Sequence, residues 1–241
     1  VIGAAGRIGF ETVQAVLENG GNVVAADSNT ELLKEKNRDL ISDQLLQMHI
    51  DITDTQSVES VIKSSREQFG SLDGAVNASY PRNAQYGRFF EDVTYKDFTE
   101  NVSMHLGGYF LVMQKLVNNA IQSQAPISIV NISSIYGSSN PRFSIYENTL
   151  MTTPIEYTAS KAGIEHMTRY VASYVKGSDI RVNCISPGGI EDNQPLEFKN
   201  AYRSHCNQKG MLHPSDVVGP TIFKDQFITG QNLIIDDGFT L

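Results

Sequence analysis

Short apolar segments alternate with longer segments of helical character along almost the entire chain. The segments 22–26, 74–77, 127–132 and 180–185 are short and rich in Val, Ile and Ala. Between them, apolar residues recur at the spacing of one helix face. This alternation predicts parallel strands joined by crossover helices, and therefore an α/β fold with a three-layer, doubly wound, Rossmann-like parallel sheet. Since such folds commonly form one unit of about 200 to 250 residues, the 241 residues predict a single domain over 1–241.

The expected elements follow from this periodicity and from the turn residues between the segments. Residues 137–154 form a loop too long for a simple connection, so we expect a substrate-loop insert there. A second, variable substrate segment is expected over 189–215. Because a glycine turn follows Val1 and Ile2 directly, we also expect most of a preceding strand to be missing from the sequence. Helices are predicted over 8–19, 31–46, 53–69, 95–123 and 155–176, and strands over 22–26, 47–50, 74–77, 127–132, 180–185 and 232–235.

Composition narrows the class of partner. The chain has 19 Lys and Arg against 27 Asp and Glu, a net charge of −8, and no basic cluster, which argues against nucleic acid. Cys184 and Cys206 lack metal or redox spacing, so no disulfide framework is expected. The five histidines show no metal-ligand spacing. With neither a membrane-length apolar run nor a signal peptide, we expect a cytoplasmic protein that binds a small molecule, without a membrane or a metal.

A glycine turn opens the chain. Gly3, Gly6 and Gly9 are three residues apart in GAAGRIG, a strand-to-helix turn whose backbone N–H groups can approach a pyrophosphate at a helix N-terminus. Asp27 follows the next strand, where a carboxylate can accept bonds from ribose hydroxyls and repel a 2′-phosphate. This favours NAD over NADP. Alternatively, Asp27 caps a helix with Ser28. Arg7 either steadies a phosphate, which would keep NADP open, or is a solvated side chain.

A tyrosine and a lysine lie four residues apart in a predicted helix. Tyr157 and Lys161 share one face, where the ammonium can lower the high pKa of the phenol. Before them, Ser133 and Ser134 end a buried strand, at the edge where open parallel sheets bind ligands. Taken separately, the pair can decorate a helix surface and the serines can cap a turn. Together with the glycine turn they predict one nucleotide site.

Four motifs follow one another in a recognisable order: the glycine turn, Asp51-Ile52, the serine strand with the Tyr/Lys helix, and Asn183 through Gly188. Over nearly its whole length the sequence resembles the short-chain dehydrogenase/reductase family. The resemblance implies that Tyr157 is the acid/base, that Lys161 lowers its pKa and holds the nicotinamide ribose, and that Ser134 orients the reacting oxygen. Cofactor contacts are expected from Gly3, Gly6, Arg7, Ile8, Gly9, Asp27, Asp51, Ile52, Asn77, Ala78, Ser79, Tyr157, Lys161, Pro187, Gly188 and Ile190.

Several positions depart from the family pattern. His105 stands where the family has a helix asparagine that holds a proton-relay water, and Asn101 lies one turn earlier. His105 either relays protons with a pKa near neutrality or fills a helix interface; Asn101 is the substitute. Ser79 replaces a usual glycine, and Asp192 replaces a threonine that often meets the cofactor carboxamide.

The resulting hypothesis is an NAD(H)-dependent oxidoreductase that interconverts a secondary alcohol and a ketone. Tyr80, Arg82, Arg142 and Tyr146 are candidate substrate contacts, which suit a hydroxyl-rich or phosphorylated substrate unless these loops are merely solvated. The segments HLGGYF, SSIYG, PRFSIYE, SPGGIEDNQP and DDGF also resemble bacterial oxidoreductases of flagellin-glycan and nonulosonic-sugar biosynthesis. The substrate expected from this resemblance is an amino sugar or sugar phosphate.

The sequence leaves two alternative functions open, and it also predicts a homo-oligomer. A sugar epimerase or dehydratase would keep NAD tightly bound, and a non-catalytic NAD sensor would not need Tyr157. The segment 229–238 is similar to the family's final strand, which often lies in an oligomer interface. We therefore expect a homodimer or homotetramer.

Overall fold

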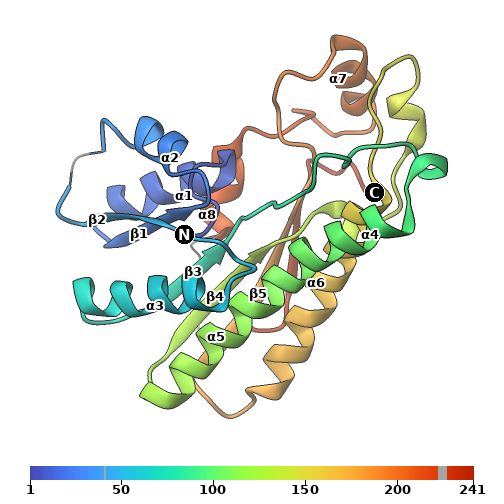
Figure 1. Ribbon diagram of the computed structural model, residues 1–241. Helices are drawn as coiled ribbons and strands as arrows, with labels where there is room; N and C mark the ends of the chain where they lie inside the picture. Colours follow the sequence, from blue (N-terminus) through green and yellow to red (C-terminus); the bar gives the residue numbers. More distant parts are fainter. Residues whose placement is uncertain (41, 222–226) are drawn as a thin grey trace.

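The computed structural model describes residues 1–40, 42–221 and 227–241 and shows an α/β fold built on one parallel sheet (Figure 1). Ile2 forms parallel bridges to Ala26 and Asn77, so it joins the pair β2-β1 to the four strands β3-β4-β5-β6. All strand pairs are parallel. The strands are β1 (Val23–Asp27), β2 (Leu45–His49), β3 (Gly74–Asn77), β4 (Ile127–Ile132), β5 (Ile180–Pro187) and β6 (Asn232–Ile235).

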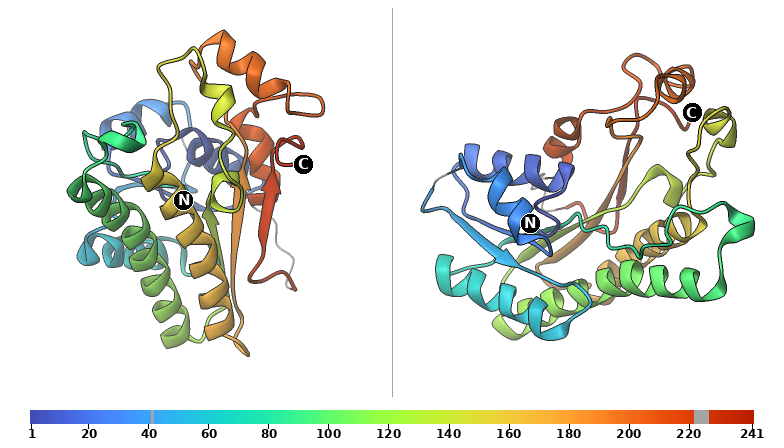
Figure 2. Two further views of the ribbon diagram at one scale, coloured as in Figure 1. Left: turned by 90° about the vertical axis from the view of Figure 1, so that its right-hand side faces the viewer. Right: turned by 45° about the horizontal axis from the view of Figure 1, so that its top comes forward.

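Helices cover both faces of the sheet, which confirms the three-layer prediction (Figures 1 and 2). Val58, Val112 and Ile164 bring three helices onto one face of the strands. Val13 and Val217 belong to the smaller clusters on the other face. The helices are α1 (Arg7–Glu18), α2 (Thr30–Lys36), α3 (Thr55–Phe69), α4 (Tyr95–Val102), α5 (Gly108–Ser123), α6 (Ile155–Tyr174), α7 (Leu196–Arg203) and α8 (Val218–Thr221). Short 3₁₀ turns span Phe90–Asp92, Ile135–Gly137, Phe143–Tyr146 and Pro214–Val217.

Most predicted elements agree with the structure, with three differences. The helix predicted over 31–46 ends at Lys36, because the amide of Asn37 donates to the Leu33 carbonyl at 3.0 Å and closes the last turn. Position 41, inside that prediction, lies outside the described residues. Strand β2 accordingly starts two residues earlier than predicted. The long helix predicted over 95–123 is interrupted by one π turn, Ser103–Gly107, between α4 and α5.

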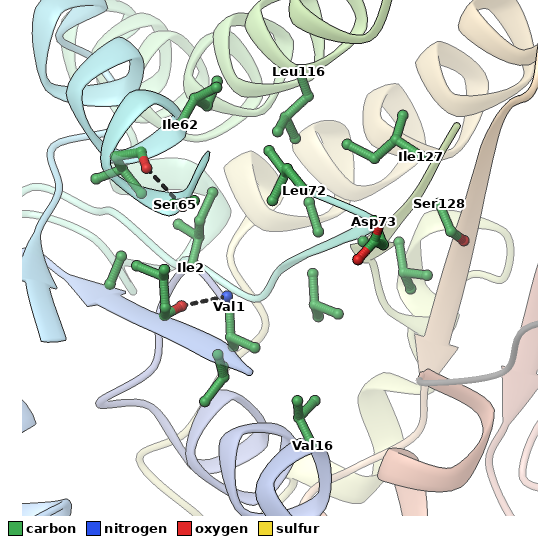
Figure 3. Close-up of a pocket in the computed structure, with 18 of the residues that line it drawn as sticks. Val1, Ile2, Val16, Ile62, Ser65, Leu72, Asp73, Leu116, Ile127 and Ser128 are labelled. Atoms are coloured by element: carbon green, nitrogen blue, oxygen red, sulfur yellow. Dashed lines mark hydrogen bonds between the residues drawn. The ribbon is translucent and has the colours of Figure 1, made fainter. Parts of the chain in front are cut away.

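A cavity of about 540 Å³ lies between β1 and β3 (Figure 3). Its lining includes Val1, Ile2 and Leu116 and the amino ends of several strands, such as Ile127 and Ser128. Ligands of open parallel sheets bind at the opposite, carboxyl edge. This apolar slot is therefore set apart from the polar side chains described next.

Candidate functional site

The glycine turn packs tightly against the carboxyl end of β3. Gly3 has a φ of +77°, and a Cβ there would lie 2.7 Å from the backbone carbon and oxygen of Ala78. Only glycine fits this position. Gly6 is the N-cap of the twelve-residue helix α1, and no side chain caps it. The first-turn N–H groups, with Ile8 and Gly9 among their residues, are thus available to an anion, as a dinucleotide pyrophosphate requires.

Asp27 ends β1 beside this turn. Its carboxylate accepts bonds from the N–H groups of Ala5 at 3.0 Å and Asn29 at 2.9 Å. The N-cap of α2 is Asn29, whose side chain accepts from Leu32 N–H, so the alternative that Asp27 caps a helix with Ser28 is wrong. The carboxylate is instead fixed next to the glycine turn, which suits a bond to ribose hydroxyls.

Arg7 pairs with Asp192. The pair connects the first turn of α1 to the segment that follows β5, and both side chains are partly exposed. Arg7 is therefore neither a free phosphate ligand nor an unpaired solvated cation. Asp192, at the position of the family's threonine, is engaged by the same contact.

The remaining predicted cofactor residues near β3 are Asn77, which ends the strand, and Ala78 and Ser79, which follow it. Asn77 accepts bonds from the Ser79 N–H at 3.2 Å and its hydroxyl at 2.6 Å. The Tyr109 hydroxyl, which the sequence did not single out, lies 2.9 Å from the Asn77 carbonyl and 3.1 Å from that of Ile132. The Asn77 Nδ2 is buried without a partner in the described structure. Such an orphaned donor calls for a ligand or water, and so the cradle fits a bound cofactor.

The other predicted contacts line the same edge. Asp51 accepts from the N–H and hydroxyl of Thr53, bonds that hold its pKa below the usual value, and Ile52 is buried beside it. Pro187 is the last residue of β5, and Gly188 continues the segment. Ile190 forms a backbone bridge to Leu212 and thereby holds the segment after β5 in place. All of these residues follow or end a strand.

Ser134, Tyr157 and Lys161 come together at the carboxyl end of β4. Ser134 lies near enough to Tyr157 to lower its pKa, and its hydroxyl accepts a hydrogen bond from the Tyr136 N–H at 3.2 Å, whereas the Ser133 hydroxyl is turned into the interior and donates to the Lys161 carbonyl at 3.0 Å. Lys161 is 4% exposed, and its ammonium donates to the Ile132 carbonyl at 2.8 Å. The ammonium lies 5.5 Å from the centre of the Tyr157 ring. A hydroxyl pair beside a buried ammonium can bind and protonate a carbonyl oxygen.

Burial shifts the acidity of both ionisable groups. It raises the pKa of Tyr157 above the usual value of a phenol, and the bond from Ser134 opposes this. Burial lowers the pKa of Lys161 to about 8, against the raising influence of Cys184 and Glu165. Tyr157 is thus a protonated acid at neutral pH, while Lys161 remains mostly charged.

The pKa of His105 is far below the near-neutral value that a proton-relay role would need. Burial, and secondly the charge of Lys161, lower its pKa to about 2, so the ring is neutral. The ring packs between Tyr80, at 5.3 Å, and Tyr109, at 5.5 Å between centroids. Its Nε2 is buried without a partner in the described structure. Of the two alternatives left open by the sequence, this burial favours packing in a helix interface over a relay with a near-neutral pKa.

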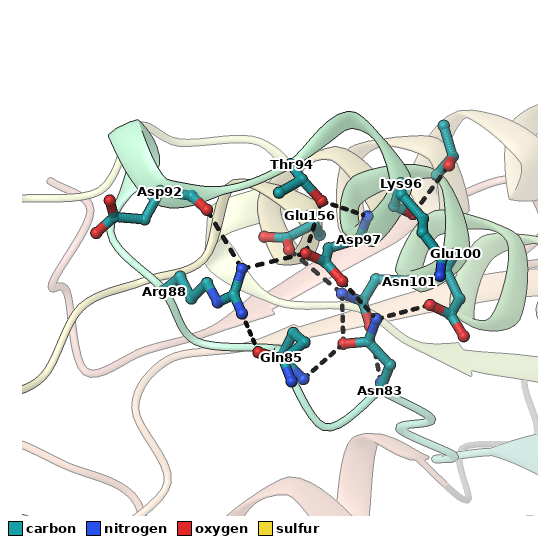
Figure 4. Close-up of polar contacts among 11 residues, drawn as sticks. Asn83, Gln85, Arg88, Asp92, Thr94, Lys96, Asp97, Glu100, Asn101 and Glu156 are labelled. Carbon is teal, nitrogen blue, oxygen red and sulfur yellow. Dashed lines mark hydrogen bonds and ion pairs between the residues drawn. The ribbon is translucent and has the colours of Figure 1, made fainter.

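Asn101 anchors the loop after β3 through Asn83 (Figure 4). Its Oδ1 accepts from the Asn83 N–H at 2.9 Å, and its Nδ2 donates to Asn83 Oδ1 at 3.2 Å and to Glu156 Oε1 at 3.3 Å. Arg88 adds an ion pair to Asp97 at 3.2 Å. The loop is held against α4 and α6 by this network.

That loop places two predicted substrate residues at the site. The Tyr80 ring meets the Tyr157 ring edge-on at 5.5 Å, and its hydroxyl bonds to that of Tyr86 at 2.6 Å. The Arg82 guanidinium lies 4.9 Å from the centre of the Tyr80 ring. Tyr86 and Glu156 were missed in the sequence, because neither belongs to a recognisable motif.

The insert packs on the segment that contains α7, as Figure 2 shows. Tyr146 contacts the Phe198 ring at 5.2 Å and bonds to the Tyr136 hydroxyl at 3.2 Å. Arg142 donates to the carbonyls of Phe239 at 3.2 Å and Leu241 at 3.3 Å. Its guanidinium therefore links the insert to the segment that follows β6. Because the guanidinium is engaged there, the structure argues against the predicted substrate contact of Arg142.

The described residues show neither a metal site nor a membrane-spanning helix. Among residues 1–40, 42–221 and 227–241, no group of three or more His, Cys, Asp or Glu side chains is arranged to hold a metal ion. Within the same described ranges, no helix has the length and apolar character needed to cross a membrane.

Comparisons with known proteins agree with this geometry. A family model described as enoyl-(acyl carrier protein) reductase matches residues 3–240. The chain is 37% identical to the post-translational flagellin modification protein A of Campylobacter coli, over all of this chain and 97% of that protein. It is 26% identical to a 7alpha-hydroxysteroid dehydrogenase of Bacteroides fragilis, over all of this chain and 93% of that one.

Among solved structures, a short chain dehydrogenase from Leptospira borgpetersenii with bound NAD+ is 34% identical. The match has a TM-score of 0.87 and covers all of this chain and 91% of that one. Together with the Ser134, Tyr157 and Lys161 arrangement, these matches show that the chain belongs to the short-chain dehydrogenase/reductase family of oxidoreductases.

Proposed function

We propose that this protein is an NAD(H)-dependent oxidoreductase that interconverts a secondary alcohol and a ketone in a carbohydrate substrate. The observation that carries the proposal is the buried ammonium of Lys161, 5.5 Å from the centre of the Tyr157 ring on α6, with Ser134 beside them at the end of β4. The glycine turn and Asp27 lie at the same edge of the sheet, where open parallel sheets bind nucleotides.

The roles of the chain's residues follow from their chemistry. A bound nicotinamide would supply or accept the hydride. Ser134 would donate a hydrogen bond to the carbonyl oxygen and orient it, and Tyr157 would donate its phenolic proton to that oxygen during reduction. The Lys161 ammonium would stabilise the phenolate left behind. In oxidation the proton moves back from the alcohol to Tyr157.

Three observations support NAD(H) rather than NADP(H). The Leptospira neighbour was solved with NAD+. The carboxylate of Asp27 is fixed beside the glycine turn, where it would accept bonds from ribose hydroxyls and repel a 2′-phosphate. Arg7, the cation nearest this turn in sequence, is neutralised by Asp192.

The carbohydrate assignment rests on the rim of the site and on one relative. Tyr80, Arg82 and Tyr146 offer aromatic faces and polar groups, which suit a hydroxyl-rich or phosphorylated ligand. The Campylobacter relative is described as a flagellin modification protein. The same proposal includes one domain over 1–241, with the insert 137–154 and the segment 189–215 bordering the substrate.

A homo-oligomer also forms part of the proposal. The outer strand β6 leaves Leu233 49% and Ile234 41% exposed. Exposed apolar residues on an edge strand favour pairing with a second copy. Sedimentation at several protein concentrations would test this, and a monomer at all of them would refute it.

The catalytic proposal is tested by binding and turnover. NADH and NADPH fluorescence titrations should give tighter binding of NADH, and absorbance of the reduced nicotinamide should fall with one of a panel of keto sugars and their phosphates. Tyr157→Phe should abolish turnover while retaining NADH binding. Turnover unaffected by this change would refute the assignment. An epimerase or dehydratase would instead bind NADH tightly and form product with no net change in absorbance. A sensor would keep its physiological role in Tyr157→Phe.

A further inference from the structure

A second carboxylate lies buried beneath the proposed catalytic residues. Glu165 is 3% exposed and stands one helical turn after Lys161 on α6. Its Oε1 lies within hydrogen-bond distance of the hydroxyls of Ser133, at 3.2 Å, and Ser186, at 2.9 Å. A buried acid is rarely retained without a partner or a role, since burying a carboxylate is unfavourable.

The carboxylate joins the turn that carries Ser134 to the helix that carries Lys161. Ser133, the residue before Ser134, is within hydrogen-bond distance of both Glu165 Oε1 and, at 3.0 Å, the Lys161 carbonyl. On the other side of Ser134, a Cβ at Gly137 would lie 2.2 Å from Glu165 Oε1. Only a glycine allows this turn to rest directly on the carboxylate. Both flanks of Ser134 therefore contact Glu165.

Lys161, four residues earlier on α6, is the buried cation near this acid. Burial raises the pKa of Glu165, and the bonds from Ser186 and Ser133 and the charge of Arg169 oppose that rise. The titratable groups that face Lys161 are Glu165, Cys184, His105 and the tyrosines 80, 109 and 157. Among these groups, Glu165 is the carboxyl group, and its charge raises the pKa of Lys161.

We propose that Glu165 is a positioning residue, which fixes the Ser134 turn on helix α6 and places one negative charge beneath the Lys161 ammonium. It has no contact with the proposed reacting atoms and acts through Ser133 and Lys161. This inference rests on the proposed function, because it assigns Glu165 to the support of that site. The inference makes two separable claims. The charge claim is that Glu165 places a negative charge near the Lys161 ammonium. The tie claim is that the Ser133 hydroxyl links the Ser134 turn to Glu165.

The charge claim is tested without any substrate. In protein labelled with 13C-lysine, the 13Cε resonance of Lys161 is assigned by its loss in Lys161→Met and titrated with pH. Glu165→Gln keeps the acceptor oxygen but removes the charge, so the pKa of Lys161 should fall from about 8 by about one unit. Glu59→Gln, which removes an exposed carboxylate paired with Lys115, is the matched control and should not change it. A Lys161 pKa equal in both variants would overturn the charge claim.

The tie claim is tested by measuring turnover with the substrate that has been identified for the wild-type protein. Ser133→Ala keeps the charge of Glu165 but removes one hydroxyl, so kcat should fall about tenfold at every pH with the Kd of NADH unchanged. Glu165→Gln should instead move the alkaline limb of the pH–rate profile to lower pH. Unchanged kcat in Ser133→Ala would refute the tie. Absence of any wild-type turnover would refute the proposed function alone, since the titration of Lys161 still decides the charge claim.

Discussion

Removal of the Lys161 charge should stabilise the fold while it abolishes catalysis. The ammonium is 4% exposed, and burial lowers its pKa from 10.5 to about 8. This difference corresponds to about 3 kcal/mol of unfavourable charge burial at pH 7. Lys161→Met keeps a flexible chain of similar length but gives up the bond to the Ile132 carbonyl, worth about 1 kcal/mol. The variant should therefore be more stable than wild type by about 2 kcal/mol.

The dependence on pH identifies the cause. Because the folded-state pKa lies below the unfolded one, the wild-type penalty is fully present below pH 8 and disappears as pH rises toward 10.5. Urea unfolding of both proteins at intervals from pH 7 to pH 10 should show the advantage of Lys161→Met shrinking across this window. Turnover should be lost at every pH. A variant less stable than wild type at pH 7, or an advantage that does not change with pH, would refute the reasoning.

Other changes test separate parts of the site. Gly3→Ala would force a Cβ against Ala78, so NADH affinity should fall at least tenfold in a fluorescence titration; unchanged affinity would mean that the turn does not bind the cofactor. Asp27→Ala should narrow the ratio of NADH to NADPH affinity, and an equal ratio would leave Asp27 only structural. Asn101→Ala should release the loop at Asn83, raising the substrate KM several-fold while NADH affinity stays constant. Loss of both together would point instead to general unfolding.

The sheet and the order of the motifs were predictable because they depend on local pattern. Strands β3, β4 and β6 agree residue for residue with the predicted strands, and β4 has the continuous apolar segment of a buried parallel strand. The meeting of Ser134 with Tyr157 followed from topology, because the carboxyl ends of parallel strands share one edge.

What was not predictable depends on contacts between distant segments. The pKa of His105 is set by its burial and by the charge of Lys161. Arg142 bonds to carbonyls almost a hundred residues away, which no spacing rule indicates. Glu165 had a weak signal, an acid one turn beyond Lys161, but an exposed and a buried acid look alike in a sequence.

The π turn at Ser103–Gly107 sets the angular phase between two halves of one long helix. A π turn accommodates one residue more than a regular α-helical turn. If the same residues formed a regular α-helix instead, α4 would be rotated by about 100° relative to α5. The Tyr109 hydroxyl would stay on the strand carbonyls, while Asn101 would turn away from Asn83. The π turn therefore keeps Asn101 directed at the loop while Tyr109 stays on the sheet, and a single-residue deletion in this segment would give a regular helix with both contacts still in phase.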